Sequence, residues 1–141
     1  MEKDNLENIV IEYFKKIDNG DSSYLELFTD DVDFFFPKFG QKKGKKALIE
    51  FGNRIGSSLI SIWHDIDGFK IIKADNKVVV EGQERGVMSD GTSWPDNNIS
   101  IGRFCSVFEF NGKFISRMYI YVDPDFPSQD LERISVLSDG Q

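Results

Sequence analysis

Hydrophobic residues recur at helical spacing in the first third of the chain. Over residues 6–17 they form one apolar stripe, which predicts an amphipathic helix. A short second helix is expected after a cap at residues 21–22, and a third over about residues 45–55. The run Val32–Phe36 between them is predicted to be a strand that Pro37 ends. This part should therefore hold three helices and one strand.

From Leu59 onward the pattern changes to alternation, with turn residues between the segments. Four antiparallel strands are predicted, over residues 59–72, 78–88, 99–110 and 113–122. Asn111-Gly112 is the strongest hairpin signal, so the last two strands should pair. Helices followed by a meander indicate an α+β fold, and a curved sheet with helices on its concave side encloses a pocket.

The composition favours one domain with a large core. The chain has 141 residues and 13 phenylalanines, more than ordinary usage supplies, and these rings need a core or a cavity wall. The domain is expected over residues 1–127, followed by a polar C-terminal tail over residues 128–141.

Charge and cysteine content exclude several partners and settings. The net charge of -7 opposes binding to nucleic acid or to an anionic membrane. No apolar run is long enough to span a bilayer, and the charged N-terminus does not resemble a signal peptide. The chain has one cysteine, Cys105, which cannot form an internal disulfide and suits a reducing compartment. A cytoplasmic protein is expected.

The order and spacing of several short segments resemble the nuclear transport factor 2-like superfamily. This superfamily includes SnoaL-like polyketide cyclases, ketosteroid isomerases and limonene epoxide hydrolases. The segments that carry the resemblance are Tyr13–Asp21, Leu27–Val32, Phe36-Pro37, Gly44, Phe104–Gly112 and Tyr121–Asp123. The resemblance implies a cystatin-like cone, with three N-terminal helices packed on a curved, mainly antiparallel sheet. It also implies a small hydrophobic ligand and a homodimer through the outer sheet face, with the candidates Trp63, Cys105, Val107 and Met118.

The same resemblance allows a comparison of this chain with the catalytic positions of two of these enzyme families. Tyr13 falls at the position of the oxyanion-binding tyrosine of ketosteroid isomerases, but their general base falls at Phe36 and their second acid at Ser106. A phenyl ring cannot abstract a proton, which argues against isomerisation by that mechanism. Arg85 falls on the arginine of limonene epoxide hydrolases, but Val87 stands where its acidic partner should be.

His64 is the best candidate for acid or base chemistry. It is the chain's one histidine, and alternation places it on the same strand face as Ile60, Ile62 and Ile66. A hydrogen-bonded core histidine is the alternative interpretation. Asp65 should point to the opposite face, so the two neighbours do not form a dyad.

Nine further residues are candidates for ligand binding. They are aromatic or polar side chains expected on inner faces or at the pocket mouth: Phe36, Phe51, Arg85, Trp94, Phe104, Ser106, Arg117, Tyr119 and Tyr121. For the last three, which share one face of the final strand, the cone wall and a rim or dimer face both remain open. Trp94 begins a loop, residues 94–98, that could cover the mouth.

Two functions follow as hypotheses. The first is a small-molecule enzyme of the cyclase, isomerase or dehydratase kind, with His64 as acid or base and Tyr13, Arg117 or Tyr119 polarising a carbonyl. The second is a non-catalytic ligand-binding or interaction module of the same fold. No metal site or cofactor is expected, because no spacing typical of zinc or calcium ligands is present.

Overall fold

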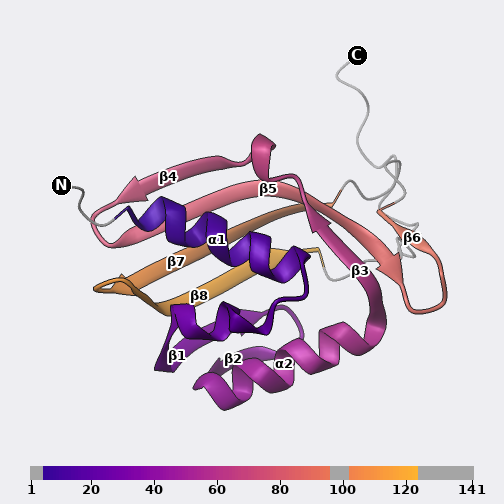
Figure 1. Cartoon of the computed structure of the whole chain (residues 1–141), viewed down its shortest axis with the longest axis horizontal. Coiled ribbons are helices and arrows are strands. Elements are labelled where there is room, and N and C mark those ends of the chain that lie inside the picture. Colours follow the sequence, from indigo (N-terminus) through magenta and orange to yellow (C-terminus); the bar gives the residue numbers. More distant parts are fainter. Residues whose placement is uncertain (1–4, 96–101, 124–141) are drawn as a thin grey trace.

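A curved sheet carries the helices on one of its faces (Figure 1). The structure is a computed structural model that describes residues 5–95 and 102–123. In the described part of the chain the sheet has eight strands, in the order β2-β1-β8-β7-β5-β3, with β4 and β6 also paired to β5. β1 and β8 pair in parallel, and the other pairs are antiparallel. The predicted α+β cone is confirmed.

The elements follow one another in the predicted order. The helices are α1 (Leu6–Asp18), the 3-10 helix η1 (Ser22–Leu27), α2 (Lys45–Ser58) and the 3-10 turn η2 (Ile66–Gly68). The strands are β1 (Phe28–Phe36), β2 (Gly40–Lys43), β3 (Leu59–His64), β4 (Lys70–Ala74), β5 (Lys77–Met88), β6 (Ser93–Trp94), β7 (Arg103–Asn111) and β8 (Phe114–Val122). None of the described helices is long and apolar enough to cross a membrane.

α1 is held by its own apolar stripe and by a cap at its start. The Asn5 side chain accepts a hydrogen bond from the Asn8 backbone N–H, which satisfies a free donor of the first turn. The buried side of the helix consists of Leu6, Val10, Tyr13 and Phe14. The helix ends at Asp18, beside β3, so this carboxylate reaches the interior from the last turn.

The prediction of a single strand over residues 59–72 is wrong, because the structure has two strands there, β3 and β4. β3 pairs with Glu84–Met88 of the long strand β5, while β4 pairs with Lys77–Glu81 at its other end. The chain must turn to follow both ends of β5, and η2 makes that turn. His64 is therefore the last residue of β3, directly opposite Glu84.

The buried residues of β8 decide which of its faces is the inner one, which the sequence left open. Met118 is fully buried, and Ile120 packs beside it against the core, so Arg117, Tyr119 and Tyr121 lie on the outer face. The register shifts between Glu109 and Phe110 as β7 pairs with β8, and this irregularity breaks the simple alternation after Ile115. Met118 is thus excluded from the proposed dimer face, and the homodimer itself stays a prediction.

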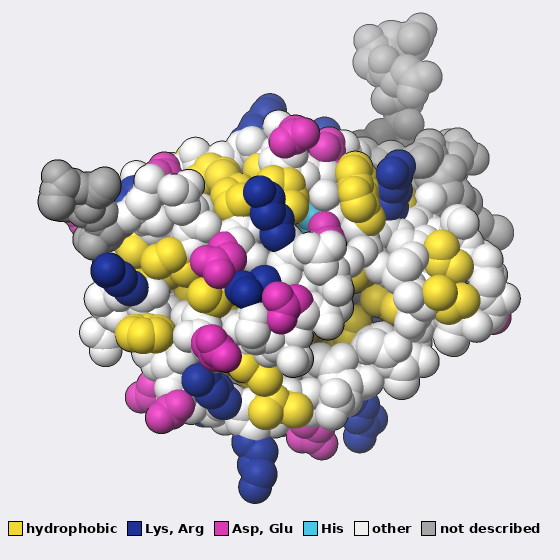
Figure 2. Space-filling view, viewed as in Figure 1, with side chains coloured by type: hydrophobic (Ala, Val, Ile, Leu, Met, Phe, Trp, Pro, Cys, Tyr) yellow, Lys and Arg dark blue, Asp and Glu magenta, His cyan; other side chains and the backbone are white. Residues whose placement is uncertain are grey.

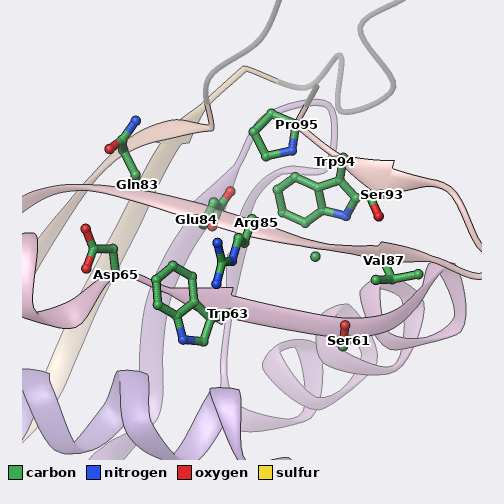
Figure 3. A pocket seen from close by; sticks show the side chains of 11 residues that line it. Ser61, Trp63, Asp65, Gln83, Glu84, Arg85, Val87, Ser93, Trp94 and Pro95 are labelled. Atoms are coloured by element: carbon green, nitrogen blue, oxygen red, sulfur yellow. The ribbon is translucent and has the colours of Figure 1, made fainter. Parts of the chain in front are cut away.

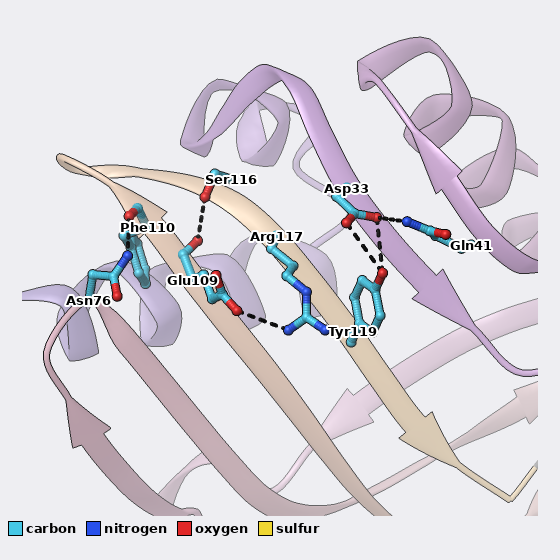
Figure 4. A network of polar contacts seen from close by, with 8 residues as sticks. All are labelled: Asp33, Gln41, Asn76, Glu109, Phe110, Ser116, Arg117 and Tyr119. Atoms are coloured by element: carbon cyan, nitrogen blue, oxygen red, sulfur yellow. Dashed lines mark hydrogen bonds and ion pairs between the residues drawn. The ribbon is translucent and has the colours of Figure 1, made fainter.

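The outer face carries a polar network (Figure 4). Tyr119 Oη lies 3.2 Å from Asp33 Oδ1 and donates to this carboxylate, which also accepts from Gln41. Arg117 bonds Glu109 at 3.1 Å and stacks on the Tyr119 ring, with its guanidinium carbon 3.6 Å from the ring centroid. These side chains satisfy one another on the face that the helices leave uncovered.

Two glycines give opposite stability predictions. Gly112 has φ +63° in the β7–β8 hairpin, where only glycine is unstrained, so Gly112→Ala should lower the free energy of unfolding by about 1 kcal/mol. Gly56 lies in α2 with open space where an added methyl group would point, so Gly56→Ala should raise it by up to about 1 kcal/mol. Urea unfolding of both variants measures the two changes, and shifts of the same sign would contradict this account.

Candidate functional site

A cavity of about 960 Å³ lies between the helices and the concave face of the sheet. Figure 2 shows this side of the molecule, where hydrophobic side chains gather in a hollow beside the ends of α1 and α2 and the start of β3. The walls are largely apolar and include the aromatic residues Tyr13, Phe14, Phe36, Phe51 and Phe104. A cavity of this size and character accommodates a hydrophobic molecule of several rings.

One cluster of ionisable groups lies in this apolar wall. His64 is 6% exposed, and its two ring nitrogens each face a carboxylate. Nδ1 is 2.5 Å from Asp18 Oδ1, and Nε2 is 3.3 Å from Glu84 Oε1. Asp18 Oδ2 also accepts the His64 backbone N–H at 2.9 Å. We call these three residues the Asp18–His64–Glu84 triad.

Aromatic rings hold the imidazole in place between the carboxylates. The Phe14 ring meets it edge-on with centroids 4.8 Å apart, and the Phe104 ring does so at 5.5 Å. Packing on these sides and hydrogen bonds at both nitrogens leave the ring one orientation. The triad is therefore pre-organised before any ligand enters.

The surroundings determine the charge of His64. Burial opposes protonation, but the hydrogen bonds to Asp18 and Glu84 and the attraction of their charges outweigh it and raise the pKa of His64 to about 9. The imidazole is then a cation at neutral pH and serves as a proton donor. Burial raises the pKa of Tyr13 above its ordinary value, so this phenol keeps its proton and can also donate.

Seven of the sequence candidates line the cavity. They are Tyr13, Phe36, Phe51, His64, Trp94, Phe104 and Ser106. The rest of the proposed loop at residues 96–98, the start of the strand predicted from residue 99 and the tail at 128–141 lie outside the described residues.

The other four candidates lie elsewhere. Arg117, Tyr119 and Tyr121 belong to the outer face described above. Arg85 points into a separate hollow of about 500 Å³ on the far side of β3 and β5, where its guanidinium carbon lies 3.9 Å from the centroid of the Trp63 ring (Figure 3). Its neighbour Glu84 points toward His64, so alternation along β5 turns Arg85 to the opposite face. His64, Arg85 and Tyr119 do not converge on one cavity.

Neither carboxylate partner of His64 was predicted from the sequence. Asp18 lies 46 positions before His64, at the end of a helix that looked like ordinary amphipathic structure. Glu84 lies directly opposite His64 on β5, a position that the pairing register alone reveals. A signal was available for Glu84, because an acidic residue among the alternating positions of a predicted central strand needs a partner.

Within the described residues, no group of three or more His, Cys, Asp and Glu side chains is arranged to hold a metal ion. Residues 10–118 match the SnoaL-like domain family. The chain belongs to this family. No curated protein matches it.

Several solved structures have the same fold as this SnoaL-like chain. An NTF2-like protein from Anabaena variabilis ATCC 29413 is 20% identical with a TM-score of 0.73, covering 89% of this chain and 95% of that one. A proposed polyketide cyclase from Xanthomonas campestris pv. campestris is 17% identical with a TM-score of 0.69, over 84% and 90%. TerC, co-crystallised with polyporic acid, is 17% identical with a TM-score of 0.70, over 84% and 91%. At these identities the likeness establishes the fold.

Proposed function

We propose that this SnoaL-like protein is a metal-independent enzyme of the cyclase, isomerase or dehydratase kind, acting on a hydrophobic, carbonyl-bearing substrate in the aromatic cavity. The observation that carries the proposal is the Asp18–His64–Glu84 triad in a largely apolar wall. Buried ionisable clusters in a cavity are typical of active sites. Two structural neighbours are consistent with this class: a proposed polyketide cyclase, and TerC, which was co-crystallised with polyporic acid.

The three residues of the triad take different roles. Both Asp18 oxygens are engaged by His64, one by Nδ1 and one by the backbone N–H, so Asp18 orients the ring and stabilises its charge. Glu84 approaches Nε2 through one oxygen at the longer distance of 3.3 Å. Substrate can therefore meet the triad at Nε2 and Glu84, with Glu84 as the base and His64 as the proton donor.

The proposed chemistry begins with an enolisation. Glu84 removes the proton from the carbon next to the substrate carbonyl, while His64 Nε2–H donates to the carbonyl oxygen as charge develops there. The Tyr13 phenol, in the same cavity wall, is a second donor for this oxygen. Return of the proton from Glu84 to another carbon completes an isomerisation. In a dehydration the same proton goes to a β-hydroxyl, which leaves as water while the carbon–carbon double bond forms. In a ring closure the enol carbon attacks a second carbonyl, whose oxygen takes the proton.

One observation favours a second candidate function. Both ring nitrogens of His64 already have partners, as in a structural ion cluster, and the cavity is large and apolar. The same fold would then be a non-catalytic ligand-binding module. A catalytic assay that also reports binding separates the two functions.

Hydrogen–deuterium exchange into 2-tetralone provides this assay. NMR in D₂O should show faster exchange next to the carbonyl with the protein than in buffer, and Glu84→Gln or His64→Gln should slow it at least tenfold. Tyr119→Phe, on the outer face, is the matched control and should exchange at the wild-type rate. Binding of the ketone without any exchange would leave the non-catalytic function, and equal rates in all variants would refute the role of the triad.

A further inference from the structure

The end of the cavity around His64 contains more acidic than basic groups. Asp18 and Glu84 contribute two carboxylates, and His64 contributes at most one positive charge. The triad is therefore negative whether the imidazole is charged or neutral. The three side chains are largely buried, and the Phe14 and Phe104 rings pack on the imidazole, so the field of this charge is screened less than in bulk water.

Neither of the two described lysines that line the cavity pairs with the triad. Among the described residues that line the cavity, the lysines are Lys16 and Lys38. Lys16 is already held by Ser23 at 2.7 Å, Asp21 at 3.4 Å and Glu12 at 3.7 Å, and Lys38 is exposed at the mouth.

The two arginines that the sequence suggested for ligand binding point away from the cavity. Arg85 lies in the outer hollow, and Arg117 is paired with Glu109 on the outer face of the sheet. No guanidinium among the described cavity-lining residues can form the two-pronged contact that carboxylates favour.

Resting on the proposed function, we infer that the site selects neutral carbonyl compounds and rejects carboxylates, and that Glu84 is the residue that imposes this choice. A ligand carboxylate at Nε2 would lie beside the Glu84 oxygen that is 3.3 Å from the same nitrogen. Like charges this close in a largely buried site disfavour binding. A ketone or ester oxygen carries only a partial charge, so Glu84 repels it far less than it repels a carboxylate, and the imidazole can still donate to it.

The test compares two probes of nearly equal shape, 2-acetylnaphthalene and 2-naphthoate. The first presents a neutral methyl ketone and the second a carboxylate on the same ring system. His64 is the one histidine of the chain, so its imidazole NMR signals report binding in the cavity and provide the dissociation constants. At pH 7 the ketone should bind at least tenfold more tightly than the carboxylate.

Glu84→Gln and Glu109→Gln form the matched pair of variants. Each removes one negative charge, but Glu109 lies on the outer face beside Arg117. Glu84→Gln should strengthen naphthoate binding and reduce the preference for the ketone to below threefold, while Glu109→Gln should leave the preference unchanged.

The outcomes separate this inference from the proposed function. If neither probe perturbs the His64 signals, the hydrophobic cavity site itself fails, and the inference fails with it. If naphthoate binds the wild type as tightly as the ketone, selection by charge is refuted while the cavity site stands. If the ketone is preferred equally in Glu84→Gln, Glu84 is not its cause and the inference is overturned.

Discussion

Replacing His64 with leucine should lower the free energy of unfolding at pH 7 by about 3–5 kcal/mol. The imidazole is the hydrogen-bond partner of both Asp18 and Glu84, and all three side chains are largely buried. Leucine fills a similar volume but leaves two carboxylates without their shared cation. The loss then comes chiefly from burying unpaired charge, which the surrounding Phe14 and Phe104 rings cannot solvate.

A triple variant provides the control for this interpretation. Asp18→Asn and Glu84→Gln combined with His64→Leu remove all three charges, so the protein should recover part of the lost stability. Urea unfolding at pH 7 measures both variants against the wild type. A His64→Leu protein within about 1 kcal/mol of the wild type would show that the triad is not a buried ion cluster in solution.

The sequence predicted the architecture well because each element carries its own periodicity. α1 shows one apolar stripe, and β7 alternates so regularly that Phe104, Ser106 and Phe108 are all buried as expected. Alternation also placed His64 on the inner side of its strand. Burial of a side chain depends on this local pattern, and a local pattern can be recognised in a single sequence.

The environment of His64 could not be predicted in the same way. Asp18 and Glu84 come to the imidazole from a helix end and from a neighbouring strand, so their proximity depends on tertiary packing and strand register. The orientation of β8 could not be decided from the sequence for a related reason. A register shift near Glu109 reverses the faces after Ile115, and nothing in the local alternation of Arg117 and its neighbours marks it.

The charge state of His64 matters for both stability and the proposed chemistry. At neutral pH a histidine with its ordinary pKa of 6.5 would be mostly neutral and could act as a base, whereas the triad raises the pKa to about 9. The role of base therefore passes to Glu84, and His64 becomes the donor. A proposal based on the residue type alone would have assigned these roles in reverse.

Raising the pH should weaken the fold between about pH 6.5 and pH 9 by about 3 kcal/mol through His64, at about 1.4 kcal/mol for each unit by which its pKa is raised. Below pH 6.5 the imidazole is protonated in the folded and the unfolded chain, so its stabilising contribution is complete. Between the two values only the folded state holds the proton, and stability falls as the pH rises. Above pH 9 both states are neutral, and the contribution has been lost.

Two measurements check this dependence. Titration of the imidazole NMR signal should give a pKa of about 9 directly, since the chain has one histidine. Urea unfolding of the wild type and His64→Gln at several pH values should give a difference in stability that shrinks across the same window, because glutamine has no proton to lose. A pKa near 6.5, or a difference that stays constant with pH, would mean that Asp18 and Glu84 do not hold the imidazole in its charged form.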